Sequence, residues 1–377
     1  MRKPKILFNI AFLNTKDMDG FTRYAMEILH RIDKSKFIFI ANENIIKKFN
    51  IENYIKVPEK FSEKNSRSNF YRFIWYQYKL RYYIHKYDIK AFYSPIPEGV
   101  IYSPIKQFIT IHDIIPIIYP QGQTRLKYYY KYVLPYLIKK NSVIITVSQN
   151  SKRDISRAYN LNGVNIFIAP SGFDIKKFYP CDRLKIDEVI SKYSLNKEYI
   201  LYTGAIRIHK NVKNLIKAFY KSKLFTKNIE LVIVGKRGND KFSKHITNLV
   251  KELNIENNIK FIDFVSDNEL ACLYSGALAF VFPSLYEGFG APPLEAMACG
   301  TPVVVSNVSS LPEVCGDAAL YVDPQNVNDI AQKLVKITTD YQLRDKLIKK
   351  GFEQIKNFSW DNTVKILENL LKEYDET

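Results

Sequence analysis

The chain has 377 residues, 46% of them hydrophobic, and its 56 Lys and Arg against 38 Asp and Glu give a formal net charge of +18. This length suffices for two domains of ordinary size, and the hydrophobic content excludes a chain that is disordered throughout. No apolar run is long enough to span a membrane, and the four cysteines form no C-x-x-C pair, so we expect neither a disulfide framework nor a metal site.

The positive charge favours binding to polyanions, such as nucleic acid, anionic lipid head groups or a diphosphate ligand. Lys, Ile, Asn and Tyr are abundant along the whole chain, so part of the charge reflects a general compositional bias. The charge alone therefore does not select a function. The cysteine usage fits a reducing cytoplasm, and we interpret the basic and apolar start of the chain as a first strand rather than a signal peptide.

Short apolar segments alternate with amphipathic ones through the first half, which is typical of a parallel α/β sheet. The predicted strands are residues 6–10, 36–41, 91–94, 108–111, 143–147 and 164–168. A helix is predicted at residues 21–32, after a turn at Gly20, and another follows the fifth strand with Ser148 or Ser151 as its N-cap.

Two stretches, residues 60–90 and 125–140, combine aromatic with basic residues. In the first stretch large apolar side chains recur at helical spacing with Lys and Arg between them, at Phe70, Phe73, Ile74, Tyr78 and Tyr82. Such helices suit a membrane interface. They equally suit helices packed on a core with solvated basic residues, and the sequence leaves both interpretations open.

His112 and Asp113 directly follow the predicted strand at residues 108–111. Parallel α/β sheets bind their ligands at the carboxyl ends of strands. A single histidine after a strand is often structural. The adjacent pair is nevertheless a candidate for ligand binding and proton transfer.

The connection between the two halves is expected within residues 170–196, where Pro and Gly interrupt the pattern. Further strands are predicted at residues 199–203, 231–234, 259–265, 277–282 and 303–305, and helices from residue 212, at 241–253, 268–276 and 329–357, and after Phe-Ser-Trp at 358–360 to about residue 373. Arg207 and Lys210 follow the first of these strands. They form either a solvated basic loop or a cationic site for a diphosphate.

Residues 282–305, FPSLYEGFGAPPLEAMACGTPVVV, form the most informative stretch. A buried strand leads into a turn with Gly288 and Gly290, then into a helix that starts near Ala291 and is closed by Gly300. Glu287 and Glu295 bracket the turn with seven residues between them.

This arrangement combines two kinds of ligand group. The free N–H groups and the positive dipole at a helix start favour phosphate, and the glycines let a ligand come close to the backbone. Carboxylates repel phosphate but accept hydrogen bonds from sugar hydroxyls. A helix stabilised by one carboxylate would explain Glu295 alone, whereas the whole set indicates a nucleotide-sugar pocket.

The stretch EGFGAPPLEAMACGTPVV resembles the Glu-seven-residues-Glu signature of the retaining glycosyltransferases of family 4, and the resemblance continues in SSLPEVCGDAALYVDP at residues 309–324. It extends over nearly the whole chain. It implies the GT-B fold, an α/β fold in which two doubly wound, Rossmann-like domains face each other across a cleft. The implied domains are residues 1–180 for the acceptor, residues 181–357 for the donor, and a last helix, residues 358–377, that crosses back to the first domain.

The resemblance also implies roles for individual residues. The donor site would comprise Gly20, Arg207, Lys210, Glu287, Gly288, Phe289, Gly290, Ala291 and Glu295. His112 would bind the transferred sugar, and Asp113 would orient the acceptor hydroxyl or take its proton. Glu287 would accept hydrogen bonds from the sugar ring and Glu295 from the ribose hydroxyls. This chain departs from the family at Asp19 and Thr22, where glycine is common, which weakens the role of Gly20. It also departs at His209, where arginine is common, and Arg207, two residues earlier, would supply the missing guanidinium.

The implied reaction is the transfer of a hexose, of mannose or glucose type, from a GDP- or UDP-linked donor to a hydroxyl of a glycan or lipid-linked glycan. Relatives work with retention and without a metal or cofactor, in the cytoplasm or on the inner face of its membrane, and no nucleic-acid partner is expected. The alternatives are a sugar phosphorylase or nucleotide-sugar epimerase on the same fold, and a basic protein that binds nucleic acid.

Overall fold

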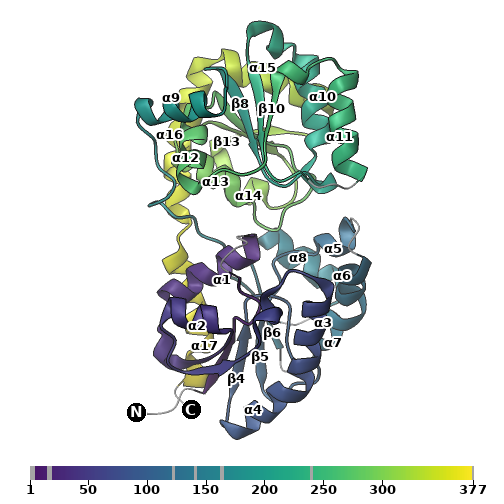
Figure 1. Cartoon of the computed structure of the whole chain (residues 1–377), viewed down its shortest axis with the longest axis vertical. Helices are drawn as coiled ribbons and strands as arrows, with labels where there is room; N and C mark the ends of the chain where they lie inside the picture. Colours follow the sequence, from purple (N-terminus) through teal and green to yellow (C-terminus); the bar gives the residue numbers. More distant parts are fainter. Residues whose placement is uncertain are drawn as a thin grey trace. The chain divides into compact units, whose positions relative to one another are not determined.

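The computed structural model describes residues 5–14, 19–120, 124–139, 142–161, 165–237 and 241–375. Its contacts divide the chain into two compact units, one of Met1–Gly172 with Trp360–Thr377 and one of Phe173–Ser359. Figure 1 shows both units, with many of their helices and some of their strands labelled. Each unit is built on one sheet, and all strand pairs in both sheets are parallel.

The first unit contains a seven-stranded sheet in the order β3-β2-β1-β4-β5-β6-β7. Its strands are β1 (Ile6–Asn9), β2 (Phe37–Ala41), β3 (Tyr54–Lys56), β4 (Ala91–Ser94), β5 (Lys106–Thr110), β6 (Ser142–Thr146) and β7 (Ile166–Ile168). The central strands are buried on both faces because helices cover both sides. Successive side chains show this: Leu7 packs in one core cluster, while the Phe8 ring lies against Phe37 and Tyr93 on the opposite face.

The helices of this unit lie on both sides of the sheet, with α1, α2 and α17 on one side and α3, α4, α6 and α7 on the other (Figure 1). They are α1 (Gly20–Arg31), α2 (Glu43–Phe49), α3 (Ser66–Trp75), α4 (Arg81–Lys86), α5 (Ile115–Ile118), α6 (Thr124–Tyr128), α7 (Leu134–Leu137), α8 (Gln149–Ala158) and α17 (Trp360–Asp375). Two π-helical segments, η3 (Tyr76–Leu80) and η4 (Tyr129–Val133), join α3 to α4 and α6 to α7.

The second unit contains a six-stranded sheet in the order β10-β9-β8-β11-β12-β13. Its strands are β8 (Tyr199–Thr203), β9 (Glu230–Val234), β10 (Ile259–Ile262), β11 (Ala279–Phe282), β12 (Val303–Ser306) and β13 (Ala319–Val322). Its helices are α9 (Arg183–Lys192), α10 (Val212–Ser222), α11 (Lys241–Glu252), α12 (Asp267–Gly276), α13 (Ala291–Ala298), α14 (Leu311–Cys315), α15 (Val327–Thr339) and α16 (Tyr341–Gln354).

Several predicted elements need correction. The helix predicted at residues 329–357 is two helices, α15 and α16, because the Asp340 side chain accepts from the Leu343 N–H and starts a new helix. The strand predicted at 259–265 ends at Ile262, since the chain turns outward and leaves Phe264 exposed. The edge strands β3 and β13 were not predicted, and Val164 of the strand predicted at 164–168 lies outside the described residues.

The unit boundaries fall at Gly172–Phe173 and Ser359–Trp360, eight residues before and two residues after the predicted positions. The first shift has a packing reason: the Phe178 ring is buried against Tyr274 of the second unit. At the second boundary, Ser359 pairs with Phe173 in an isolated parallel bridge. Among the described residues, no helix is both long enough and apolar enough to cross a membrane.

Candidate functional site

A glycine with a left-handed backbone fixes the turn between β11 and α13. Gly290 has φ +93°, and a Cβ atom there would lie 2.6 Å from the Leu311 Cδ2 atom. Any other residue would therefore be strained at this position. The next residue, Ala291, begins α13, so the turn delivers the chain directly into the start of a helix, as the sequence predicted.

The loop after β8 is fastened to this turn by hydrogen bonds. Its end forms a short 3-10 turn, η5 (Ile208–Lys210), and Asn211 then adopts a left-handed conformation before α10. The Leu285 N–H donates to the His209 carbonyl at 2.7 Å, and Asn211 Nδ2 donates to the Pro283 and Pro324 carbonyls at 2.9 and 2.7 Å. The two loops are thus held as one assembly.

Lys210 and Glu287 meet in this assembly. The Lys210 ammonium lies 2.7 Å from Oε1 and 2.9 Å from Oε2 of the Glu287 carboxylate, and it lies over the Phe282 ring at 5.0 Å. The Glu287 side chain is only 8% exposed and that of Lys210 is 19% exposed. The structure therefore brings together two residues that were predicted from segments far apart in sequence.

Two serines hold the backbone of Glu287 in place. The Glu287 N–H donates to Ser309 Oγ at 3.0 Å, and the Ser309 hydroxyl donates to the Glu287 carbonyl at 2.6 Å. The Ser310 hydroxyl donates to the carbonyls of Glu287 and Phe289. These serines were not among the predicted site residues, although they stand at the start of the second stretch that carries the resemblance.

His209 is buried beneath the basic loop. Burial lowers the pKa of His209 from 6.5 to about 4, and Lys210 and Arg207 act in the same direction against Glu287. The ring is therefore neutral at pH 7. His209 cannot replace the cationic arginine that is common at this position in the family.

Glu295 contacts Tyr274 of the same unit. Its carboxylate is buried, and Oε2 accepts a hydrogen bond from the Tyr274 hydroxyl at 3.3 Å. The same hydroxyl lies 2.9 Å from Thr203 Oγ1, at the end of β8. Glu295 thus has a structural contact of its own in addition to its predicted role with ribose hydroxyls.

The remaining predicted donor residues of this unit differ in exposure. Arg207 is exposed at the start of the 3-10 turn. Gly288 and Phe289 are buried, and the Phe289 ring packs edge-on against Phe358 at 5.6 Å. The Phe289 side chain is therefore used in packing, which leaves only its backbone for the predicted donor contact.

In the first unit, His112 is a buried ring at the end of β5. Its Nε2 lies 2.9 Å from the Pro95 carbonyl, and its ring packs edge-on against Phe21 and Tyr24. Burial lowers the pKa of His112 to about 4. Because a carbonyl can only accept, the neutral ring carries its proton on Nε2 and leaves Nδ1 as an acceptor.

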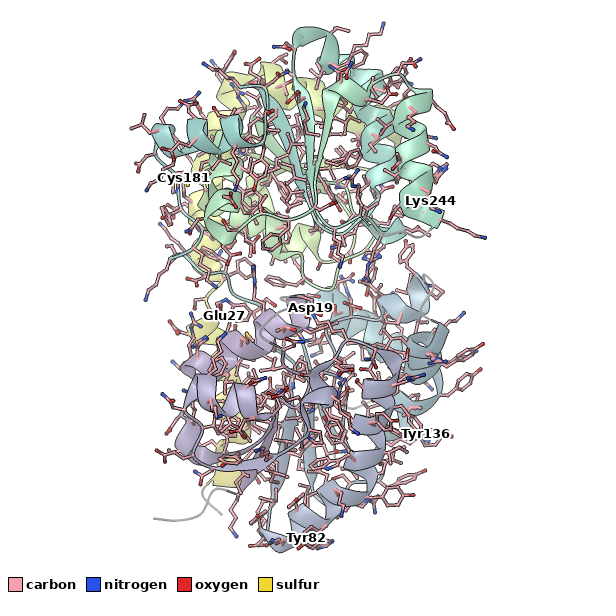
Figure 2. The ribbon with its side chains drawn as sticks, in the orientation of Figure 1. Asp19, Glu27, Tyr82, Tyr136, Cys181 and Lys244 are labelled. Atoms are coloured by element: carbon pink, nitrogen blue, oxygen red, sulfur yellow. The ribbon has the colours of Figure 1, made fainter. Side chains whose placement is uncertain are left out.

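Asp113 and Gly20 lie at helix starts in the same unit. Asp113 Oδ1 accepts from the Ile115 N–H at 2.9 Å, at the first turn of α5. Gly20 begins α1, and a Cβ atom there would meet nothing within 4 Å. Asp19, labelled in Figure 2, caps this helix by accepting from the Thr22 N–H at 2.8 Å and pairs with Lys64. A phosphate near Gly20 would therefore meet a carboxylate.

A polar network that the sequence analysis missed lies beside His112. The Tyr76 hydroxyl donates to Asn9 Oδ1 at 3.0 Å and to Glu98 Oε2 at 3.1 Å, and Arg72 pairs with Glu98 at 2.7 Å. Asn9 Nδ2 donates to Ser94 Oγ at 3.0 Å. Asn9 and Ser94 end β1 and β4, so their position at the carboxyl ends of strands was a signal that could have identified them.

Two family models match the chain. The model of glycosyl transferases group 1 matches residues 185–354, and the model of Glycosyltransferase Family 4 matches residues 19–177. The group 1 match lies within the second unit, and the Family 4 match covers most of the first unit and the first five residues of the second. The chain belongs to the group 1 glycosyl transferases.

The curated relatives of this glycosyltransferase include two bacterial enzymes. It is 35% identical over 259 residues to the O-antigen chain mannosyltransferase B of Escherichia coli, a match that covers 67% of this chain and 66% of that protein. It is 31% identical over 325 residues to the O-antigen chain mannosyltransferase RfbU of Salmonella typhimurium, a match that covers 85% of each.

The solved structures similar to this glycosyltransferase include Anabaena Alr3699/HepE in complex with UDP and glucose. That structure matches with a TM-score of 0.75 at 17% identity, over 98% of this chain and 100% of the other. The predicted GT-B fold is confirmed by such neighbours. Among the residues that the model describes, no group of three or more His, Cys, Asp and Glu side chains is placed to hold a metal ion.

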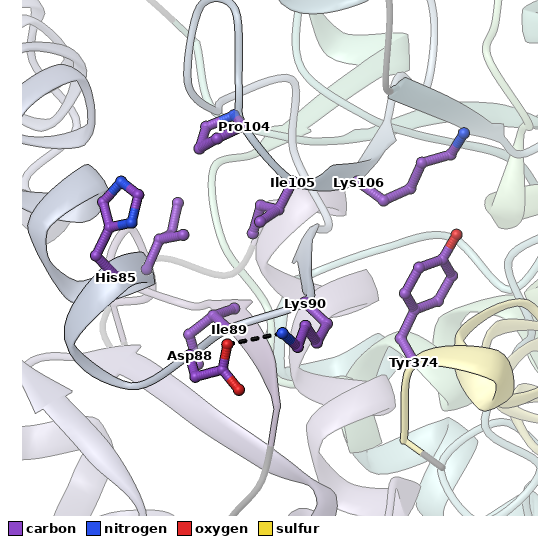
Figure 3. A pocket seen from close by; sticks show the side chains of 9 residues that line it. His85, Asp88, Ile89, Lys90, Pro104, Ile105, Lys106 and Tyr374 are labelled. Carbon is purple, nitrogen blue, oxygen red and sulfur yellow. Dashed lines mark hydrogen bonds and ion pairs between the residues drawn. The ribbon is translucent and has the colours of Figure 1, made fainter. Parts of the chain in front are cut away.

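This glycosyltransferase also has a hollow outside the candidate site. Figure 3 shows it lined by His85, Asp88, Lys90, Lys106 and Tyr374, among others. It lies where β4 and β5 begin, whereas His112, Asn9 and Ser94 lie where strands end. Ligands of parallel sheets bind at the carboxyl ends of strands, so we do not assign this hollow to the reaction.

Proposed function

We propose that this glycosyltransferase transfers mannose from a nucleotide-diphosphate sugar to a hydroxyl of a glycan or lipid-linked glycan, with retention at the anomeric carbon and without a metal ion. The observation that carries the donor site is the Lys210–Glu287 pair next to the start of α13. The names of the two O-antigen mannosyltransferases support mannose as the sugar. The UDP complex of a structural neighbour supports a nucleoside diphosphate as the leaving group.

In the proposed donor site, cations bind the diphosphate and carboxylates bind the sugar and the ribose. Lys210 and the free N–H groups at the start of α13 stabilise the charge that develops on the leaving diphosphate. Arg207, which is exposed on the same loop, adds a second cation. Glu287 accepts hydrogen bonds from the sugar ring, and Glu295 accepts from ribose hydroxyls. A bound diphosphate shares the Lys210 ammonium with Glu287, so the pair orients the cation before the donor arrives.

The proposed acceptor site lies in the first unit. Neutral His112 offers Nδ1 to a hydroxyl of the transferred sugar, and Asp113 orients the acceptor hydroxyl. The bond from the anomeric carbon to the diphosphate oxygen breaks while the acceptor oxygen forms a bond on the same face. The acceptor proton passes to the leaving phosphate, so no enzyme-bound sugar intermediate is needed. We place this reaction in the cytoplasm, which the free cysteines fit.

The test is a transfer assay with GDP-mannose, UDP-glucose and UDP-galactose as donors and a mannose-terminated oligosaccharide as acceptor. We expect product with GDP-mannose, α-linked by NMR, with the same rate in EDTA. A β-linked product would contradict retention, and loss of activity in EDTA that Mg²⁺ or Mn²⁺ restores would contradict metal independence. Release of sugar phosphate in place of nucleoside diphosphate would favour the phosphorylase alternative.

A further inference from the structure

The helices α3 to α4 and α6 to α7 of the first unit expose an unusual set of large side chains. Nine of these side chains, between 38% and 74% exposed, come from these helices and the loop beside them: Phe70, Tyr71, Ile74, Tyr78, Tyr82, Tyr102, Tyr128, Tyr132 and Tyr136. Single exposed apolar residues are ordinary on a protein surface, but a concentration of this size marks an interaction site. We call this surface the tyrosine face.

The tyrosine face is the outer side of helices whose inner side forms core. Tyr76 and Leu80 pack in one core cluster, and Tyr130 and Leu134 pack in another. The exposed residues recur every three or four positions, as expected for one stripe along a helix. Side chains spaced four residues apart shift steadily around an α-helix, because the helix has about 3.6 residues per turn. The wider turns of the π segments η3 and η4 counter that shift and keep the rings in line.

The two stripes form one surface. The Phe73 ring packs edge-on against Tyr129, and Tyr102 packs edge-on against Tyr136, each with ring centroids 6.4 Å apart. Arg81 Nη2 donates to the Ile101 carbonyl at 2.6 Å and ties the intervening loop to α4. Figure 2 shows the labelled side chains of Tyr82 and Tyr136 pointing away from the body of the unit.

The helices of the tyrosine face carry positive charge only. The chain contains Lys and Arg but no Asp or Glu from residue 64 to 87 and from residue 124 to 139. Lys86, Lys131 and Lys139 lie over the rings of tyrosine neighbours, at 5.7 Å from Tyr82, 5.2 Å from Tyr132 and 4.8 Å from Tyr136. Each ammonium is thus held at the level of the rings.

We propose that the tyrosine face docks on a lipid bilayer that contains anionic lipids. Tyrosine has an apolar ring and a polar hydroxyl, which suits the head-group level of a bilayer, and lysines among the rings meet lipid phosphates. Single-stranded nucleic acid would instead need free ring faces for base stacking. A lysine ammonium occupies one face of the rings of Tyr82, Tyr132 and Tyr136, where a base would stack, so the observations favour the membrane. The proposal does not depend on the donor or the acceptor.

The experiment is flotation of the whole protein with vesicles of phosphatidylcholine alone and of phosphatidylcholine mixed with phosphatidylglycerol. We expect binding to the mixed vesicles only, weakened by salt. The variant Tyr78→Ser/Tyr82→Ser/Tyr132→Ser/Tyr136→Ser should reduce the partition coefficient about tenfold or more, because it removes the apolar contact. Lys79→Gln/Lys86→Gln/Lys131→Gln/Lys139→Gln should do the same by removing charge.

A matched control is Tyr220→Ser/Tyr341→Ser, which removes two exposed tyrosines of the second unit and should bind as the wild type does. Transfer to a soluble acceptor should stay unchanged in all three variants, which separates docking from catalysis. Equal binding by the tyrosine variant and this control would overturn the proposal. Absence of binding to the mixed vesicles would also overturn it. A third contrary result would be an oligonucleotide that displaces the vesicles from the wild type and still binds the tyrosine variant.

Discussion

Two buried histidines respond to pH in the same direction. Burial lowers the pKa values of His112 and His209 to about 4, so both rings stay neutral in the folded protein at mildly acidic pH. In the unfolded chain they take up a proton near pH 6.5. The contribution of the two histidines to the free energy of unfolding is therefore complete above about pH 6.5. It is lost as the pH falls from about 6.5 towards 4, because unfolding then binds protons.

The variant His112→Gln should reduce the acid sensitivity of the first unit. Between pH 7 and pH 5 the wild type should lose about 2 kcal/mol more unfolding free energy than the variant, since one proton uptake is removed. Tryptophan fluorescence during urea unfolding measures this unit alone, because Trp75 and Trp360 both belong to it. His85→Gln, at an exposed position, is the control. Identical pH dependence in both variants would contradict the assignment.

The Lys210–Glu287 pair should separate stability from activity. Lys210→Met leaves a buried carboxylate without its cation and should destabilise the second unit by about 3 kcal/mol. Lys210→Met/Glu287→Gln should regain most of that stability, as measured by calorimetry, yet keep the loss in kcat/KM of about 10²-fold or more. Lys217→Met, at an exposed position of α10, is the control. Recovered activity in the double variant would show that the pair is only structural.

At the residue scale, the sequence located residues whose position follows from a strand and whose role follows from the family signature. Glu287, Lys210 and His112 lie after β11, β8 and β5, as expected, and their roles with the donor stay predictions. The serines that hold Glu287 were not predicted, because their role depends on the distance between two loops. Arg72 and Glu98 were missed for the same reason, since their pairing joins positions 26 residues apart.

At the scale of elements, Gly290 and Gly20 each stand at the start of a helix, and replacing each by alanine should change stability differently. Gly290→Ala should destabilise the second unit by about 1–3 kcal/mol, because φ is +93° and Leu311 blocks the new Cβ atom. Gly20→Ala should leave stability unchanged or slightly raised, since its Cβ atom meets nothing. Calorimetry measures both effects.

The variant Gly20→Ala also tests the predicted donor contact at Gly20. Weaker donor binding in Gly20→Ala, at unchanged melting temperature, would support a phosphate that comes close to this backbone. Unchanged donor affinity would mean that Gly20 only begins α1, which would agree with the capping carboxylate of Asp19.

The basic and aromatic helices show why periodicity alone was ambiguous. Phe70, Ile74, Tyr78 and Tyr82 repeat like the buried face of a helix, but they are exposed, and Tyr76 and Leu80 occupy the core. Spacing reveals that a stripe exists and not which side is buried. The π segments η3 and η4 were not predicted, since the spacing of apolar residues was interpreted with the α-helical repeat alone.

At the scale of the whole molecule, the alternation of strands and helices predicted two parallel sheets, and the structure has two. Edge strand β3 was missed because it has only three residues with both ends exposed, so it lacks the continuous apolar run of a central strand. Edge strand β13, ALYV, is apolar throughout and was overlooked after the signature stretch. The break between α15 and α16 was missed because the sequence around Asp340 fits a continuous helix. Only the structure shows that the Asp340 side chain caps a new helix.

The helix α17 completes the first unit from the far end of the chain. Trp360 packs edge-on against Tyr24, Arg31 of α1 pairs with Asp361 at 3.1 Å, and the Thr363 hydroxyl donates to the Pro170 carbonyl. Trp360 is only 4% exposed. The unit therefore includes a buried anchor that is encoded after the whole second unit.

Trp360→Ala should destabilise the first unit by about 3–5 kcal/mol, because it removes a large buried ring. Fluorescence of the remaining Trp75 during urea unfolding measures the change, and Lys365→Ala, exposed on the same helix, should leave the midpoint unchanged. A calorimetric transition of the second unit at its wild-type temperature would show that the effect stays within one unit. A wild-type midpoint for Trp360→Ala would contradict the anchoring role.

The position of α17 also sets an order of events during synthesis. Domains generally fold from the N-terminus as the ribosome releases them. Here the first unit cannot be completed until Trp360–Asp375 have been synthesised, and these residues leave the ribosome only after the second unit. The second unit, which is continuous in sequence, can fold first. The nascent first sheet therefore stays without α17 while roughly half of the chain is still being made, and this is the period in which a chaperone would be most needed.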